Sequence, residues 1–240
     1  MAFSYSPKII TDGLVLYLDA GNPLSYPGSG TTWTDLSRGQ NPGTLTNGPT
    51  FDSGNGGSIV FDGTDDYITG LDNISINTGL PFTVEFWSNI TQYSDPFPTI
   101  IQLKTNTTYG WNLSFNISTG VGGAYYGVLF GSSDTWARIR TNNPPATEFW
   151  YNVAVAYNGS GASTISNYNV YLNSSLQTLY STGGFNNTTQ DNYIGTTNAA
   201  SRGIDDFRGK ISSVRVYNKA LSQPEITQNY NATKTRFGLT

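Results

Sequence analysis

Residues 150–173 read WYNVAVAYNGSGASTISNYNVYLN, and the spacing of their apolar side chains decides the fold class. Near the end of this stretch Tyr168, Val170 and Leu172 alternate with Asn169 and Tyr171. A period of two places one set of side chains on a buried face and the other on an exposed face, as in antiparallel sheets. The run WYNVAVAY is also rich in β-forming residues, and the Gly, Ser and Asn residues after it predict a connecting turn.

Runs of the same kind recur along the whole chain. In FTVEFW (82–87) the apolar positions 82, 84 and 86 alternate with 83, 85 and 87, which predicts one buried and one exposed face. Strands are expected at 14–18, 58–61, 82–87, 99–103, 111–117, 125–130, 136–140, 150–157, 168–172, 192–195 and 210–217. Short strands with turns between them predict an all-β fold, a sandwich of two antiparallel sheets.

One helix is expected, near the end of the chain, in ALSQPEITQNY (220–230). Ser222 is a suitable N-cap, Pro224 falls in the first turn, and Glu225 follows the cap by three residues, which is the spacing of a capping box. Leu221 and Ile226 have the spacing of a hydrophobic staple. The pattern predicts a helix of two to three turns from about residue 223, packed against one edge of the sandwich.

The composition excludes several classes of function. The chain contains no His and no Cys, which removes the commonest general base, the usual serine triad, thiolate metal sites and disulfides. Lys and Arg number 12 against 16 Asp and Glu, without a basic run, so nucleic acid is not an expected partner. The apolar run LVLYL (14–18) is too short for a signal peptide or a membrane span. The chain is therefore expected to be made in the cytoplasm and not inserted into a membrane.

Three blocks of sequence together resemble one family. They are GLVLYLDAGNP with SIVFDGTDDYI, then FTVEFW with WYNVAVAYNGS and YNVYLNSSLQ, then IGTTN with DFRGKISSVRVYNKALSQPEI. In this order they resemble the laminin-G-like jelly roll of the concanavalin A-like lectin and glucanase superfamily. The resemblance implies a single domain over residues 1–240, with its core at about 12–230 and terminal tails available for docking.

The opening block, GLVLYLDAGNPLSYPGSGTTWTDLS (13–37), is also similar to a form of this domain common in structural proteins of marine tailed phages. The similarity implies a non-enzymatic virion protein, such as a capsid decoration, fibre or adhesion component. Its partners would be other virion proteins, its own copies in a homo-oligomer, and a host-surface glycan. The alternative is a bacterial carbohydrate-binding lectin domain, extracellular or at the cell surface.

The loop FDGTDDYITG (61–70) has three interpretations. Asp62-Gly63 is typical of a turn, with the later aspartates accepting backbone N–H bonds. Alternatively Asp65 or Asp66, with Asp62 and Asp205, holds a structural calcium ion, which the resemblance implies; the spacing is not that of an EF-hand, and no cofactor is otherwise required. The family pattern has an aspartate where this chain has Ser212, so a metal site that used it would lack that carboxylate. Catalysis by these aspartates is the third interpretation.

Sugar binding requires an exposed aromatic ring and a few groups for the hydroxyls. The candidates on mid-chain strands are Trp111, Tyr125, Tyr126, Trp136 and Arg138, although Trp and Tyr also fill the cores of sandwiches. A glycan hydrolase or lyase is the least favoured function. The glucanase motif E-x-D-x-x-E is absent, and the chain has three glutamates, at 85, 148 and 225, with Glu225 assigned to the helix cap.

Overall fold

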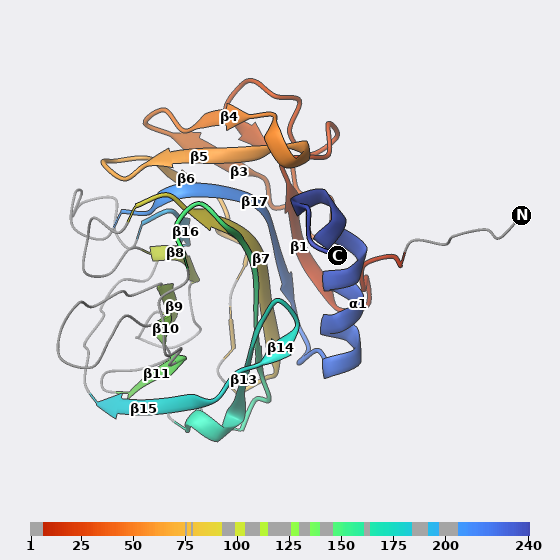
Figure 1. Cartoon of the computed structure of the whole chain (residues 1–240), viewed down its shortest axis with the longest axis vertical. Helices are drawn as coiled ribbons and strands as arrows, with labels where there is room; N and C mark the ends of the chain where they lie inside the picture. The colour runs from red at the N-terminus through yellow and green to blue at the C-terminus, as the bar shows by residue number, and fades with distance from the viewer. Residues whose placement is uncertain are drawn as a thin grey trace, which may run out of the picture.

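The computed structural model describes residues 7–74, 76–77, 79–92, 99–103, 111–114, 126–129, 135–139, 146–160, 164–183, 192–196 and 206–240. Within these ranges the regular secondary structure is mostly β, in antiparallel sheets, with a single short α-helix near the C-terminus (Figure 1). The prediction of a two-sheet antiparallel sandwich with one C-terminal helix is confirmed.

The larger sheet has the strand order β14-β13-β12-β7-β17-β5-β4, and β1 pairs with the second half of β17. Its strands are β1 (Leu14–Asp19), β4 (Thr50–Asp52), β5 (Ser58–Asp62), β7 (Phe82–Ile90), β12 (Trp150–Tyr157), β13 (Tyr168–Leu172), β14 (Ser175–Leu176) and β17 (Arg208–Tyr217). β17 is therefore central, because it is hydrogen-bonded to β7 on one side and to β5 and β1 on the other.

The facing sheet has the order β2-β3-β6-β16-β8-β9. Its strands are β2 (Thr32–Trp33), β3 (Gly43–Thr46), β6 (Tyr67–Thr69), β8 (Thr99–Leu103), β9 (Trp111–Ser114) and β16 (Tyr193–Ile194). A third, three-stranded sheet contains β10 (Tyr126–Leu129), β11 (Thr135–Ile139) and β15 (Leu179–Gly183). Three short 3₁₀ turns complete the described chain: η1 (Gly54–Gly56), η2 (Ile165–Asn167) and η3 (Lys234–Phe237).

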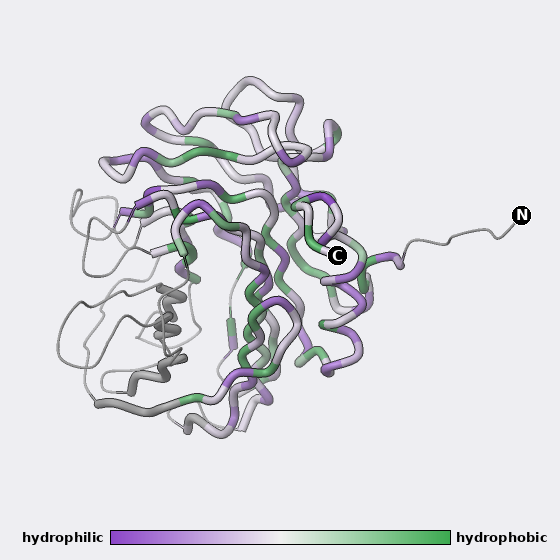
Figure 2. The backbone as a smooth tube through the Cα atoms, in the orientation of Figure 1, coloured by the Kyte–Doolittle hydropathy of each residue, from purple (hydrophilic) through white to green (hydrophobic). Residues whose placement is uncertain are grey.

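The main core lies between the two larger sheets. Val84, Phe86 and Val214 from the larger sheet and Ile68 and Ile101 from the facing sheet are buried in one apolar cluster. Apolar residues run along the central strands that supply it (Figure 2). This is the arrangement that alternating strands produce when two sheets pack face to face.

The helix α1 (Gln223–Thr233) covers the outer face of the larger sheet (Figure 1). Glu225 reaches back to the backbone N–H of Ser222 (2.8 Å), and Leu221 and Ile226 are buried in one cluster with Tyr217. The predicted N-cap and staple are confirmed. The expectation that β7 has an exposed face is wrong, because all nine of its residues are buried. The helix, not solvent, meets its outer side.

Candidate functional site

The acidic loop after β5 forms a tight turn. Gly63 has φ +75°, a conformation that glycine adopts readily, and the Thr64 N–H donates to the Asp62 carboxylate (2.8 Å). The Asp66 carboxylate accepts the N–H of Asp62 (3.0 Å), while the Asn47 amide donates to the Asp65 carbonyl (2.9 Å). The interpretation of Asp62-Gly63 as a turn with a later aspartate accepting a backbone N–H is confirmed.

The turn also brings three carboxylates together. One oxygen each of Asp62, Asp65 and Asp66 lies within 4.8 Å of the others. Burial raises the pKa of Asp66 to about 6; the N–H of Asp62 acts in the opposite direction, and nearby carboxylates, including that of Asp206, add to the rise. Asp205 lies outside the described residues. Asp206, its neighbour, is buried.

The three carboxylates fit a hard divalent cation. Oxygens that ligate one calcium ion at about 2.3–2.6 Å are at most about 5.2 Å apart, and the separations in this loop fall inside that limit. Asp62, Asp65 and Asp66 would be the carboxylate ligands, and the ion would offset the repulsion between them. Calcium binding stays a prediction.

Replacing Asp66 by asparagine tests the loop. Because the folded-state pKa of about 6 exceeds the ordinary 3.8, the folded protein binds the Asp66 proton more tightly than the unfolded chain, so stability falls as pH rises across this window. With a chelator present, D66N is therefore expected to raise the melting temperature by about 5 °C at about pH 8 and to leave it unchanged at about pH 4. Asp72→Asn, at an exposed position outside the three-carboxylate cluster, is the matched control.

The same calorimetry tests the metal. Excess calcium should raise the melting temperature of the wild-type protein and leave D66N unchanged, since an ion that binds the folded state stabilises it. A wild-type melting temperature that calcium and chelator both leave unaltered would contradict the calcium prediction.

Ser212 lies in a different cluster, built around Arg236. The Arg236 guanidinium donates to Asp19 Oδ1 (2.7 Å), to Ser212 Oγ (2.7 Å), and to the carbonyls of Asn55 (2.9 Å) and Gly57 (3.1 Å). The Ser212 hydroxyl itself donates to the Gly57 carbonyl (2.7 Å). Ser212 therefore joins β17 to η1 and η3 and takes no part in the acidic loop.

Glu85 is the one strand glutamate in the described chain, and it is enclosed. Its carboxylate faces α1, with Arg215 Nη1 and the Asn152 amide at 3.1 Å from one oxygen and the Asn229 amide at 2.7 Å from the other. Glu85 and Arg215 are 0% and 1% exposed. A carboxylate held in this way has no access to a substrate.

The other two glutamates do not form a catalytic pair with it. Glu225 accepts from the Ser222 N–H and from Lys219 (2.9 Å), as the helix cap predicts. Glu148 is exposed, directly before β12. No two glutamates therefore lie on one strand face, which the glucanase arrangement requires.

The structure leaves the predicted sugar-binding residues untested. Tyr125 lies outside the described residues. Trp111 lies on β9, Tyr126 on β10, and Trp136 and Arg138 on β11, strands of which only the backbone is described. β11 pairs with both β10 and β15, so Tyr126 lies opposite Ile139 and Trp136 opposite Thr182. Trp111 belongs to a different sheet.

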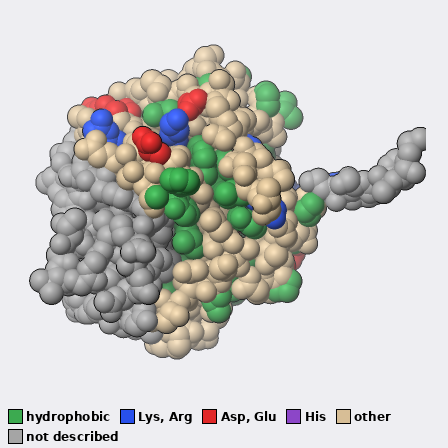
Figure 3. Space-filling model, in the orientation of Figure 1, with side chains coloured by type: hydrophobic (Ala, Val, Ile, Leu, Met, Phe, Trp, Pro, Cys, Tyr) green, Lys and Arg blue, Asp and Glu red, His purple; other side chains and the backbone are tan. Residues whose placement is uncertain are grey.

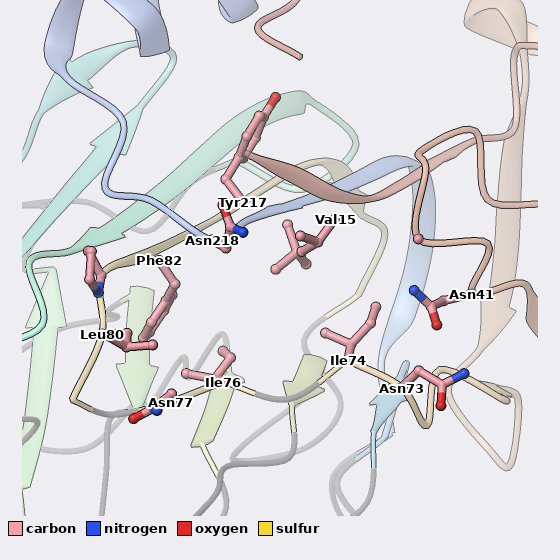
Figure 4. Close-up of a pocket in the computed structure, with 13 residues that line it drawn as sticks. Val15, Asn41, Asn73, Ile74, Ile76, Asn77, Leu80, Phe82, Tyr217 and Asn218 are labelled. Atoms are coloured by element: carbon pink, nitrogen blue, oxygen red, sulfur yellow. The ribbon is translucent and has the colours of Figure 1, made fainter. Parts of the chain in front are cut away.

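A cavity of about 420 Å³ opens at one end of the sandwich. β1 and β17 form one side and the segment before β7 forms the other (Figure 4). Its lining consists of apolar and amide side chains: Val15, Gly39, Asn41, Asn73, Ile74, Ile76, Asn77, Leu80, Pro81, Phe82, Val216, Tyr217 and Asn218. The sequence did not predict this site. The cluster NISINTG (73–79) was the available signal, but Asn and Gly equally indicate a turn.

The described surface around these sites carries little charge. On the face in Figure 3, charged side chains gather near β4 and β5, and most of the remaining described surface is uncharged. Among the described residues, no helix has the length and apolar character needed to cross a membrane.

Comparisons with known proteins agree with the fold. The family model described as the concanavalin A-like lectin/glucanases superfamily matches residues 62–227. No curated protein matches the chain in sequence. Domain 4 of AbnA, a GH43 extracellular arabinanase from Geobacillus stearothermophilus solved with arabinotriose, is 18% identical and superposes with a TM-score of 0.62, covering 92% of this chain and all of that domain.

Two further solved structures show the same architecture. The receptor-binding domain of botulinum neurotoxin type G is 16% identical with a TM-score of 0.57, covering 91% of this chain and 51% of the toxin domain. A sialidase from Trypanosoma rangeli with the inhibitor DANA is 14% identical with a TM-score of 0.56, covering 95% of this chain and 35% of the sialidase. At these identities the likeness is one of fold.

Proposed function

Because the chain belongs to the concanavalin A-like lectin/glucanase superfamily, we propose that it is a non-enzymatic binding domain whose ligands are glycans. Members of this superfamily either cleave glycans or bind them, and the choice depends on the site rather than on the fold. The observation that carries the proposal is the enclosure of Glu85. The strand glutamate that a glucanase-like mechanism would need is 0% exposed and paired with Arg215 beneath α1.

A binding role needs neither a titrating acid nor a nucleophile. It needs a concave site with a few placed polar groups and an apolar wall. The cavity beside β1 and β17 has this character. One solved structure of similar fold supports glycan as the ligand class, since it is a domain in complex with arabinotriose.

The proposal predicts binding without turnover. On an array of natural glycans the full chain should show saturable, sugar-specific retention. Incubation of the retained glycans with the protein should leave them intact by mass spectrometry, because Glu85 is enclosed and the sequence lacks the glucanase motif E-x-D-x-x-E. Products of cleavage that disappear on Asp66→Asn would show a hydrolase and contradict the proposal. Absence of retention across the array would contradict it as well.

The place of the protein on a phage particle, as a capsid decoration, fibre or adhesion component, stays a prediction from sequence resemblance. Glycan binding is compatible with it, since an adhesive virion part also contacts a host surface. Quantitative mass spectrometry of purified particles tests the location separately: hundreds of copies would indicate a capsid decoration, and its absence from particles would favour a bacterial lectin.

A further inference from the structure

The cavity between β1, β17 and the 73–81 segment is built for a small neutral ligand. Its volume, about 420 Å³, falls within the range of about 300–1,000 Å³ that small-molecule sites occupy. It lies where the core reaches the end of the sandwich, so Phe82 and Val216 belong to both the cavity wall and the main core. A ligand placed there would touch the most firmly packed part of the molecule.

Among the residues that the structure describes, no charged side chain lines the cavity. The one titratable lining residue, Tyr217, has its hydroxyl directed away from it (Figure 4), donating to the Ile10 carbonyl (3.2 Å) and accepting from Asn229 (3.0 Å). A carboxylate, phosphate or ammonium group would therefore lose its hydration without gaining a counter-charge, which is costly. This lining selects for ligands without charge.

The polar groups of the lining are side-chain amides with unused hydrogen-bonding capacity. Asn41 is 5% exposed, and its Oδ1 has no donor among the described residues. A buried acceptor of this kind is rare in folded proteins, and a ligand hydroxyl would satisfy it after rotation of the amide. Asn73 and Asn218 stand at the rim, exposed, and their amides make no hydrogen bond within the described chain. An amide both donates and accepts, as a sugar hydroxyl does.

Apolar side chains lie on both sides of the cavity, beside the amides. Ile76 and Phe82, on one side, are 3% and 4% exposed, and Val15 lies on the β1 side (Figure 4). Leu80, on the same segment as Ile76, is 56% exposed. A lining that mixes apolar side chains with amides matches a ligand that carries both C–H groups and hydroxyls, as a pyranose or furanose ring does.

The segment that forms the far wall is held in place before any ligand arrives. The Asn192 amide, 1% exposed, donates to the carbonyls of Leu71 (2.6 Å) and Ile74 (2.7 Å). The Leu80 N–H closes a turn onto the Asn77 carbonyl (2.9 Å). Binding at a site ordered in advance costs less conformational entropy.

We infer that this cavity binds one neutral sugar unit of a glycan, with the amides of Asn41, Asn73 and Asn218 holding its hydroxyls and Leu80 covering its apolar side. The inference rests on the proposed function and gives that function a site different from the mid-chain aromatic residues.

The experiment is a titration of the full chain, by calorimetry and by NMR, with galactose, fucose, N-acetylglucosamine and arabinotriose, and with glucuronic acid as a charged contrast. Two rim variants, Asn218→Ala and Leu80→Arg, remove an amide and place a charge at the entrance. Both positions are exposed, so folding should be unaffected. Matched controls are Asn169→Ala, on the exposed side of β13, and Leu24→Arg, at a leucine that is 79% exposed.

A neutral sugar should bind the wild-type protein and both controls, and bind each rim variant about tenfold more weakly, which corresponds to one lost hydrogen bond or apolar contact. Asn41→Leu should also lose binding while keeping its melting temperature, because leucine replaces an amide whose oxygen has no partner.

Three results would overturn the inference, and they differ in what else they contradict. If a sugar binds equally to the wild-type protein and the rim variants, the cavity is not the site, although the glycan-binding function stands. If none of the sugars, nor any glycan on the array, binds the wild-type protein, the proposed function fails and the cavity assignment fails with it. Preference for glucuronic acid over the neutral sugars would equally contradict an uncharged site.

Discussion

Replacing Glu85 by glutamine is expected to lower the melting temperature by about 10 °C, because removing one partner of a buried ion pair costs about 3–5 kcal/mol. The substitution keeps the shape of the side chain but leaves the Arg215 guanidinium, 1% exposed, without a counter-charge. Apart from Glu85, the nitrogens of Arg215 have no hydrogen-bond partner in the described chain, although the Tyr17 ring lies 5.3 Å away. Scanning calorimetry measures the shift.

The matched control is Glu148→Gln, which removes the same charge from an exposed position and should leave the melting temperature unchanged. A double variant, Glu85→Gln with Arg215→Met, removes both charges and should recover much of the loss, because no unpaired charge then remains. If E85Q and E148Q have the same melting temperature, the Glu85–Arg215 ion pair does not contribute to stability as its geometry indicates.

Trp87→Ala is the second substitution with a large expected effect, about 3–5 kcal/mol. The Trp87 indole is 0% exposed, stacks on Tyr230 at 5.7 Å and on Phe237 at 4.1 Å between ring centroids, and donates to the Thr233 hydroxyl (2.9 Å). It is the main contact of β7 with α1 and η3. Alanine would remove it and leave a cavity beneath the helix.

Amide hydrogen exchange shows where W87A loosens the structure. Exchange should become faster throughout α1 before it does so in the core between the sheets, since the lost contacts lie on the outer face of the larger sheet. Phe149→Ala is the control. It also replaces an aromatic side chain by alanine, but Phe149 is 61% exposed. If hydrogen exchange in W87A becomes faster to the same extent on both faces of the larger sheet, the helix and the sheet open as one unit.

The sequence was sufficient for the architecture because strand and cap signals are local. The runs at 82–87 and 150–157 lie within β7 and β12, and Ser222, Glu225 and Ile226 form the predicted start of α1. Short strands without apolar runs were missed. β3, with the sequence GTLT, is ordered by its pairing with β2 and β6, and such pairing has no local signal.

The functional site depends on contacts between distant segments, and the sequence could not predict it. Alternation on β7 indicated an exposed side for Glu85, but α1, more than a hundred residues later, covers that side. The unpartnered amide of Asn41 becomes visible only when the loop near residue 74 and the end of β17 are placed beside it. The turn at Asp62 was predictable, since its bonds join residues close in sequence.

The central position of β17 also determines when the sheet can form during synthesis. β7, β5 and β1 all pair with residues 208–217, which are made after nearly all the other strands. At about 5–20 residues per second, these three strands wait roughly 6–40 s for their shared neighbour, β1 the longest and β7 the shortest time. During that time their edges are open to pairing with other chains. Production of this protein is therefore expected to be limited by aggregation of the nascent chain, and slower translation would lengthen the vulnerable interval.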